Sequence, residues 1–398
     1  MTTLADRTLP IKPSVTLAIA AKAGKLRAEG VDVVNFSAGE PDFDTPERIK
    51  AAAVEALKKG MTKYTDVRGI EPLREAIAEK YQREYGLAYR KDEVLVSCGA
   101  KHSLYNLFQA AVNPGDEVLI PAPYWVSYSD MALLAGGVPK IIPTTEATEF
   151  RIRAQQLADT LSPRTRIFVL NSPCNPTGAS YDKDELLAIA KVIDKHKCLI
   201  IADDIYEKIV YDAFHVHNLV ELSPSLRDRT IIVNGVSKTY AMTGWRIGYA
   251  LGSEDIISAA AKIQSQSTSN PTSIAQAAAL EAIRGRQDDV AMMVGEFQKR
   301  RNVIVERLNA IDGIHCLKPQ GAFYVFPNIS AFIGKTANRK KLGSPCDVAD
   351  YLLEEAKVAA VPGEDFGSKA HIRLSYATSR ENIEEGCRRM RDALGKIR

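Results

Sequence analysis

Between residues 47 and 290 the sequence alternates strand-like and helix-like segments, and this alternation limits the possible folds more than any other feature. The strand-like runs are short and almost wholly apolar, which is typical of strands buried on both faces. Such strands separated by helices predict an α/β domain with a mostly parallel sheet. The expected strands are 93–97, 117–120, 140–143, 166–170, 197–202, 230–233 and 247–251, and the expected helices are 47–59, 71–85, 101–112, 125–135, 183–196 and 255–264.

The segments on either side of this region have a different pattern. Residues 1–46 contain one helix at about 15–29, a short strand at 31–36 and a turn-rich segment from 37 onward that either lines a site or merely connects domains. From about 274 a long helical pattern leads into short strands near 314–317, 322–326, 358–361 and 372–375, a helix near 347–356 and a closing helix. We therefore expect an N-terminal arm (1–46) packed with a small α+β domain (291–398), and a large α/β domain (47–290) with helices flanking its sheet.

The composition excludes several classes of protein. The chain has 398 residues, of which 45% are hydrophobic and 25% charged, as in soluble globular proteins. A net charge of +3 without a dense basic patch argues against a nucleic-acid partner. No apolar run is long enough for a membrane span, and no apolar leader indicates a signal peptide. Six cysteines without CxxC pairing indicate reduced thiols and a cytoplasmic location, and we assign no metal site.

Chemically useful residues follow several of the expected strands. Gly99 and Ala100 open a helix, whose free N–H groups suit a phosphate, although a simple turn explains them as well. Asp203 ends an apolar strand and needs a cationic partner if it is buried, or it is only a helix cap. Lys238 and Arg246 lie in a loop of small residues and could be ordinary surface cations. Because the carboxyl ends of the strands meet at one edge of such a sheet, we expect these residues to converge.

This combination indicates a particular cofactor. The chain contains neither GxxxxGK[ST] nor GxGxxG, so nucleotide-binding fingerprints are absent. Pyridoxal 5'-phosphate is a cofactor that uses all three kinds of group together: a phosphate cradle, a carboxylate for its ring nitrogen and a lysine that can form an imine.

The motifs resemble those of the fold-type I (class I) pyridoxal-phosphate-dependent aminotransferases, and among them the subgroup Ib aspartate aminotransferases. The resemblance covers nearly the whole chain, and its carriers are 38–43, 63–64, 171–178, 203–206, 237–238, 242–248 and 372–377. It implies the PLP-transferase fold type I and a homodimer that acts on amino acids and 2-oxo acids.

The resemblance also assigns roles. Lys238 would form the Schiff base with the cofactor and then move the proton between substrate and cofactor. Asp203 would pair with the pyridine nitrogen, and Tyr206 and Asn175 would bond the ring oxygen. The remaining cofactor contacts implied are the phosphate ligands Gly99, Ala100, Lys101, Ser237 and Arg246, the stacking residue Trp125, and Tyr64 from a second subunit.

Substrate recognition depends on two cationic positions. The resemblance implies that Arg373 binds the α-carboxylate with help from Asn175 and the Gly39 backbone, whereas the simpler interpretation is a surface charge. For the distal carboxylate, residues 264–271 lack the arginine that a neighbouring subgroup supplies from its partner subunit. Subgroup Ib members use a lysine instead, and Lys101 stands at that place. Lys12 on the arm is a second candidate and keeps activity on prephenate open.

We therefore expect ping-pong transfer of the amino group from L-aspartate to 2-oxoglutarate. The alternatives are an aspartate/prephenate aminotransferase, or other chemistry on the same scaffold, such as a C–S lyase or an aromatic or alanine aminotransferase. A transcription regulator with an aminotransferase-like domain is disfavoured, because the pattern begins within about fifteen residues of Met1 and leaves no room for a helix-turn-helix.

Overall fold

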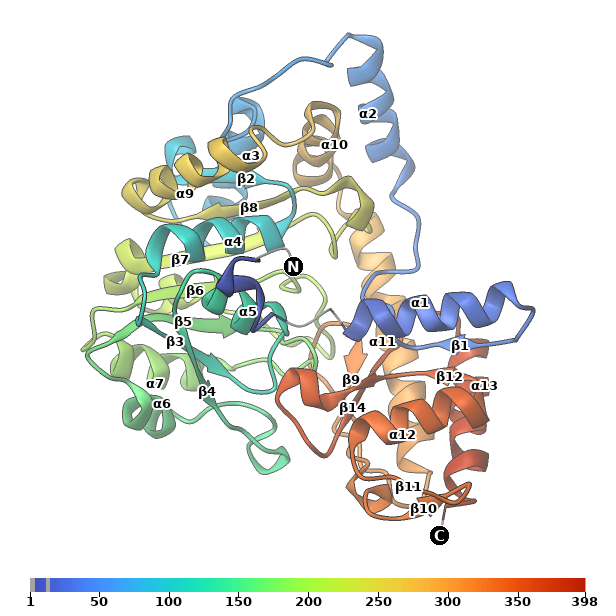
Figure 1. Ribbon diagram of the computed structural model, residues 1–398. Coiled ribbons are helices and arrows are strands. Elements are labelled where there is room, and N and C mark those ends of the chain that lie inside the picture. Colours follow the sequence, from blue (N-terminus) through green and yellow to red (C-terminus); the bar gives the residue numbers. More distant parts are fainter. Residues whose placement is uncertain (1–3, 12–14, 398) are drawn as a thin grey trace.

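A seven-stranded sheet forms the largest element of the computed structural model, which describes residues 4–11 and 15–397. Its strand order is β2-β8-β7-β6-β5-β3-β4, and all neighbours are parallel except β8, which is antiparallel to β2 and β7 (Figure 1). The mixed, mostly parallel sheet is therefore confirmed. The strands are β2 (Val94–Ser97), β3 (Glu117–Pro121), β4 (Val138–Ile142), β5 (Thr165–Asn171), β6 (Leu199–Asp203), β7 (Thr230–Gly235) and β8 (Gly248–Leu251).

Alternate residues of these strands enter separate cores, which explains the continuous apolar runs. Ile167 and Val169 pack on one face of β5, whereas Phe168 and Leu170 pack on the other. The first face is covered by α4 (Ala100–Ala111), α5 (Ser127–Leu134) and α9 (Glu254–Ser267). The second face is covered by α2 (Glu47–Lys58), α3 (Glu71–Tyr85), α6 (Ala154–Thr160), α7 (Lys183–Ile193), α8 (Leu219–Leu222) and α10 (Ser273–Arg284).

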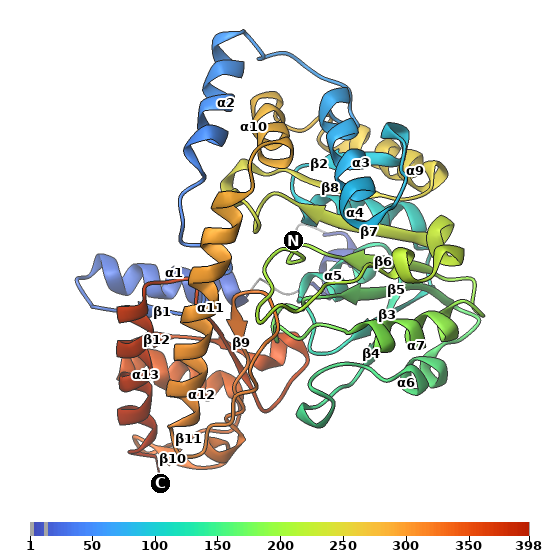
Figure 2. The ribbon, with the colours of Figure 1, turned by 180° about the vertical axis from the view of Figure 1, so that it is seen from behind.

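A smaller antiparallel sheet lies beside the first, in the order β13-β14-β9 (Figures 1 and 2). Near it, the N-terminal strand β1 pairs in parallel with β12, so segments more than 300 residues apart in sequence lie side by side. On this arrangement we propose domain boundaries near 46 and 290. The elements of this region are α1 (Val15–Ala28), β1 (Val34–Asn35), α11 (Asp288–Asn309), β9 (Tyr324–Val325), β10 (Thr336–Ala337), β11 (Lys340–Lys341), α12 (Pro345–Tyr351), β12 (Val358–Ala359), β13 (Val361–Pro362), β14 (Ile372–Ser375) and α13 (Arg380–Leu394).

Several expected elements differ from the observed ones. The strand expected at 358–361 is two strands, β12 and β13, which pair with different partners, and the long helical pattern from about 274 is two helices, α10 and α11. The strand expected at 314–317 is reduced to an isolated bridge between His315 and Asn328, because only this pair is in register. The helix expected at 347–356 is α12 followed by a wider π-helical turn from Leu352 to Ala356, whose apolar side chains are buried. Helical spacing of apolar residues predicts a helix, but it does not distinguish α-helical from π-helical hydrogen bonding.

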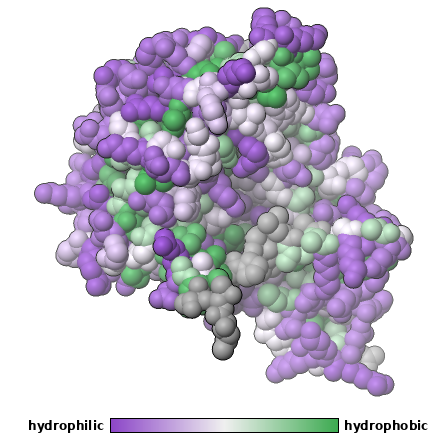
Figure 3. Space-filling view, turned by 45° about the horizontal axis from the view of Figure 1, so that its top comes forward, coloured by the Kyte–Doolittle hydropathy of each residue, from purple (hydrophilic) through white to green (hydrophobic). Residues whose placement is uncertain are grey.

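The outer surface is mostly hydrophilic, as Figure 3 shows for one face. Hydrophobic residues gather near the top of that face, the end at which Figure 1 shows α2. Val54 and Leu57 of α2 are half exposed, at 50% and 53%. Within the described ranges, no helix combines the length and the apolar character that crossing a bilayer requires.

Candidate active site

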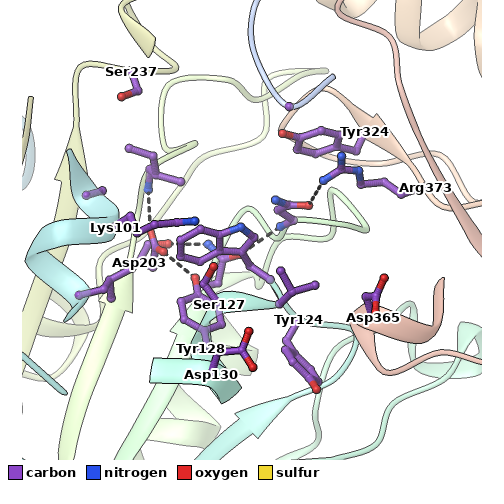
Figure 4. Close-up of a pocket in the computed structure, with 18 of the residues that line it drawn as sticks. Lys101, Tyr124, Ser127, Tyr128, Asp130, Asp203, Ser237, Tyr324, Asp365 and Arg373 are labelled. Carbon is purple, nitrogen blue, oxygen red and sulfur yellow. Dashed lines mark hydrogen bonds between the residues drawn. The ribbon is translucent and has the colours of Figure 1, made fainter. Parts of the chain in front are cut away.

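The register of the large sheet brings the ends of five strands to one edge. Asn171 at the end of β5 pairs with Asp203 at the end of β6, and Gly235 at the end of β7 pairs with Gly248. Because β8 is antiparallel, its first residue, Gly248, also pairs with Ser97 at the end of β2. A cavity of about 940 Å³ lies beyond these ends and is also lined by residues from the smaller sheet (Figure 4).

Lys238 reaches this cavity from the loop after β7. Its Nζ donates a hydrogen bond to the carbonyl oxygen of Gly39, which belongs to the turn-rich segment of the arm. Burial and the nearby Arg373 guanidinium lower the pKa of the Lys238 ammonium to about 8. A useful fraction of this amine is therefore uncharged near neutral pH, which a nucleophile or a general base requires.

Asp203 is the last residue of β6 and is 4% exposed. Burial raises the pKa of its carboxyl group to about 6, and a hydrogen bond from the Tyr128 hydroxyl to Oδ2, at 2.5 Å, opposes that rise. Across the described residues, no cation lies within ion-pair distance of Asp203. A buried carboxylate in this position fits a cationic ring nitrogen.

The start of α4 and Arg246 form a cradle that fits a phosphate group. Gly99 has φ +90°, and a Cβ atom there would lie 2.4 Å from Arg246 Nη2. A Cβ atom on Gly248 would lie 2.0 Å from the backbone nitrogen of Ala100. The backbone of β8 is therefore in direct contact with the backbone at the start of α4. The guanidinium of Arg246 is held by the carbonyl oxygens of Thr243 and Cys98, at 2.8 and 3.3 Å. Helix-start N–H groups beside an arginine suit an oxyanion.

Arg373 of β14 is a buried cation at the opposite side of the cavity (Figure 4). It is 2% exposed, and burial lowers its pKa. Its guanidinium donates to Asn175 Oδ1 at 3.1 Å and to the Ser37 carbonyl oxygen at 2.9 Å, and its buried Nε atom has no hydrogen-bond partner among the described residues. In the part of the chain that is described, no carboxylate pairs with Arg373. Such a cation fits a carboxylate of a ligand.

Asn175 and Tyr206 are both buried at this edge. The backbone N–H of Asn175 donates to Asn171 Oδ1 at 3.0 Å, which fixes the turn after β5. The hydroxyl groups of Tyr206 and Tyr324 are 2.9 Å apart, and burial holds the pKa of Tyr206 well above its usual value.

Lys101 and Trp125 lie together at the outer side of the cavity, as Figure 4 shows for Lys101. The ammonium group of Lys101 is 4.8 Å from the centre of the Trp125 ring. Partial burial and Arg246 lower the pKa of Lys101, whereas Asp130 opposes that change. The arrangement leaves a cation facing the cavity.

The structure does not bring every predicted residue to this cavity. Ser237 lines it, and Gly99 lies beneath Arg246, but Tyr64 is 90% exposed and outside the lining. Lys12 falls outside the described residues. Pro10, two residues earlier, does line the cavity, so the arm reaches the site.

Sequence reasoning missed three residues that contact the site. Tyr128 bonds Asp203, Tyr324 bonds Tyr206 and lies 4.6 Å below the Arg373 guanidinium, and the Ser37 carbonyl oxygen accepts from Arg373. Tyr128 follows Trp125 by one helical turn, and this spacing could have revealed it. Nothing in the local pattern marks Tyr324 or a backbone carbonyl.

Comparison with known proteins places this geometry in a family. The model of aminotransferase class I and II matches residues 31–390. This chain belongs to the class I and II aminotransferases. These enzymes generally depend on pyridoxal phosphate and act on amino and keto acids.

Relatives of this aminotransferase match it from end to end. An aspartate/prephenate aminotransferase of Cereibacter sphaeroides is 50% identical over 98% of each chain. The aspartate aminotransferase structure from Rhizobium meliloti has a TM-score of 0.96 at 45% identity and covers 100% of both chains. That of the Thermus thermophilus enzyme with maleate has a TM-score of 0.93 at 43% identity and covers 99% of this chain and 100% of that one.

Proposed function

We propose that this aminotransferase binds pyridoxal 5'-phosphate and transfers the amino group of L-aspartate to 2-oxoglutarate, giving oxaloacetate and L-glutamate. The observation that carries the proposal is the pairing, in one cavity, of a buried lysine with a lowered pKa and a buried arginine without a carboxylate partner. The lysine suits amine chemistry, and the arginine suits the α-carboxylate that every amino acid and 2-oxo acid carries.

The residues around the cavity fit the cofactor. The N–H groups of Gly99 and Ala100, with Ser237 and Arg246, would hold the phosphate, and the Asp203 carboxylate would face the ring nitrogen. Trp125 would cover the ring, and Tyr206 and Asn175 would reach the ring oxygen. When bound, the cofactor supplies an electron sink that stabilises negative charge at the substrate Cα.

The chain's own groups would then position the substrate and move protons. Arg373 and Asn175 would fix the α-carboxylate, which leaves the Cα–H bond of the substrate in one orientation. Lys238, whose amine is uncharged above pH 8, would take the proton from Cα of the amino acid and hand it on within the first half of the cycle, and would give a proton to Cα of the new amino acid in the second half. Tyr128 would keep Asp203 ionised, so that the charge facing the ring nitrogen persists.

A dicarboxylate substrate is supported by Lys101. Its ammonium group faces the cavity beside Trp125. The relatives named above are aspartate or aspartate/prephenate aminotransferases, and the Thermus enzyme was solved with maleate, a four-carbon dicarboxylate. We propose that Lys101 binds the distal carboxylate, with Lys12 of the arm as a second cation.

Amino-donor profiling with 2-oxoglutarate tests this proposal. Aspartate should be the best donor, and double-reciprocal plots should be parallel, as in a ping-pong mechanism. In Lys101→Ser, KM should rise about tenfold or more for aspartate and much less for alanine, because only aspartate loses a charge-assisted contact. Equal effects on both donors would contradict the role of Lys101, and intersecting lines would contradict the mechanism.

Prephenate as amino acceptor is the second candidate. The Cereibacter relative is named for both substrates. With aspartate as donor, formation of the amino acid from prephenate should be measurable alongside that from 2-oxoglutarate. If no product forms from prephenate, the enzyme accepts only the smaller 2-oxo acids.

Two further features belong to the proposal. We propose a homodimer, because Tyr64 and the apolar side chains of α2 are exposed in the single chain and suit a subunit interface. We also propose a cytoplasmic location, which the free state of all six cysteines supports.

A further inference from the structure

Two histidines and a glutamate gather on the surface near the loop that precedes α8. His215, His217 and Glu221 each offer a ligand atom, and these atoms all lie within 4.8 Å of one another. The rings of His215 and His217 are 4.5 Å apart, and His217 Nδ1 lies 3.5 Å from Glu221 Oε1. We propose that these three side chains bind one divalent transition-metal ion of the zinc class. The proposal does not depend on the proposed function.

The sequence explains why the three side chains meet. His215 and His217 are separated by one residue in an irregular segment, and their rings lie side by side. Glu221 is one helical turn beyond His217 and follows the cap residue Asn218.

One ligand of the cluster is held in place by the backbone. The N–H of Asn218 donates to Glu221 Oε2 at 3.2 Å, which orients the carboxylate and leaves Oε1 toward His217. His217 is mostly buried, and its Nδ1 atom has no hydrogen-bond partner among the described residues. A buried ring nitrogen without a partner beside an oriented carboxylate is a position at which a metal ion would satisfy both groups.

The loop that carries the histidines is fixed at both ends. On one side, Asp212 pairs with Arg301 at 2.9 Å, and on the other, the Asn218 side chain donates to Asp204 Oδ2 at 2.9 Å. The ligands therefore need only small adjustments. Zinc ligands at about 2.0–2.2 Å from the ion are about 3.3 Å from one another, so the ligand atoms, now within 4.8 Å, must move closer by up to about 1.5 Å.

The chemistry of the ligands selects the metal. Two imidazoles and one carboxylate suit Zn²⁺ and neighbouring late transition metals, whereas Mg²⁺ and Ca²⁺ prefer oxygen ligands. His215 is exposed, so water can complete the coordination.

Zinc titration of the tag-free holoenzyme by calorimetry tests the proposal, after removal of metal with a chelating resin. We expect one equivalent of Zn²⁺ per chain, and affinity lower by about tenfold or more in His215→Gln and Glu221→Gln. His215 is exposed, and glutamine at 221 can still accept from the Asn218 N–H, so both variants should fold. Co²⁺ should give ligand-field absorption in wild type that each variant loses.

His315→Gln is the matched control. His315 is also exposed and lies 3.1 Å from a glutamate, Glu146, and it is not one of the proposed ligands. Zinc affinity should be unchanged in this variant. The proposal is overturned if wild type binds no stoichiometric zinc, if His215→Gln and Glu221→Gln bind it as well as wild type, or if only His315→Gln weakens binding.

Discussion

At the level of single residues, Lys238 and Arg373 share one cavity, and each affects the charge of the other. Arg373 is fixed by Asn175 and the Ser37 carbonyl oxygen, so it cannot turn away from the lysine. Together with burial it lowers the pKa of Lys238 from 10.5 to about 8. A ligand carboxylate bound to Arg373 would offset this repulsion. The protonation state of Lys238 therefore depends on whether substrate is bound.

The lowered pKa predicts how fast the apo-protein captures pyridoxal phosphate. Only the uncharged amine attacks the aldehyde, so the rate should rise about tenfold per pH unit below 8 and level off above it. An ordinary lysine would keep the rate rising to about pH 10. Stopped-flow absorbance between pH 6 and 9.5 measures this, with Lys238→Ala as the control that should form no covalent product. A rate still rising at pH 9.5 would contradict the lowered pKa.

Tyr128 predicts a shift in the acid limb of the pH–rate profile. Its hydroxyl stabilises the charged form of Asp203, so Tyr128→Phe should raise the pKa of this carboxyl further above about 6. Activity that requires the carboxylate is present above this pKa and lost as pH falls through it. The acid limb should therefore move upward by about 1–2 pH units, since a hydrogen bond to a charged group contributes about 1.5–3 kcal/mol.

The control for Tyr128→Phe is Tyr89→Phe. Tyr89 is also buried, but its hydroxyl has no partner among the described residues and does not contact Asp203. Its profile of kcat against pH should match wild type. An unshifted acid limb in Tyr128→Phe would show that the hydrogen bond does not set the charge of Asp203.

At the level of secondary-structure elements, the site depends on a close approach between β8 and α4. Gly248 has no side chain, and the backbone of Ala100 fills the space that a Cβ atom would need. The same close contact places the N–H groups at the start of α4 beside the Arg246 guanidinium. Backbone atoms cannot rotate out of the way as a flexible side chain can, so the fit leaves no room for adjustment.

Gly248→Ala should therefore weaken both the fold and the cradle. We expect a loss of about 3 kcal/mol in the free energy of unfolding, at the upper end for overpacking, and weaker binding of pyridoxal phosphate. Gly244→Ala is the matched control, because no atom lies within 4 Å of a Cβ atom at that position. Denaturant unfolding of the two apo-proteins measures the difference. Equal stability of the two variants would show that β8 and α4 can separate without cost.

The same elements show what the sequence could and could not predict. All seven strands of the large sheet were predicted, because each is a continuous apolar run, and Asn175, Asp203 and Lys238 were predicted because they follow such runs. The contacts of Tyr324, which lies in the smaller sheet, were not. Tyr324 lies 118 positions from Tyr206, and the pairing that joins them depends on long-range packing that no local period encodes.

At the level of the whole molecule, one predicted cofactor ligand lies away from the cavity of its own chain. Tyr64 is 90% exposed, although large aromatic side chains are usually buried or in interfaces. Val54 and Leu57 on the preceding helix α2 are half exposed as well. We expect two copies of the chain to cover this surface, with Tyr64 of each copy completing the phosphate cradle of the other.

Hybrid dimers test this expectation. In a dimer of one Lys238→Ala chain and one Tyr64→Phe chain, the second chain has its own Lys238 and receives an intact Tyr64 from the first. That site should bind pyridoxal phosphate as tightly as wild type, whereas the Tyr64→Phe homodimer should bind it about tenfold more weakly, since about 1.4 kcal/mol is lost with one hydrogen bond to a charged group. Activity of purified hybrids against cofactor concentration measures the two affinities. If Tyr64 acted within its own chain, the hybrid would keep the weakened affinity, because its only Lys238 would stand beside phenylalanine.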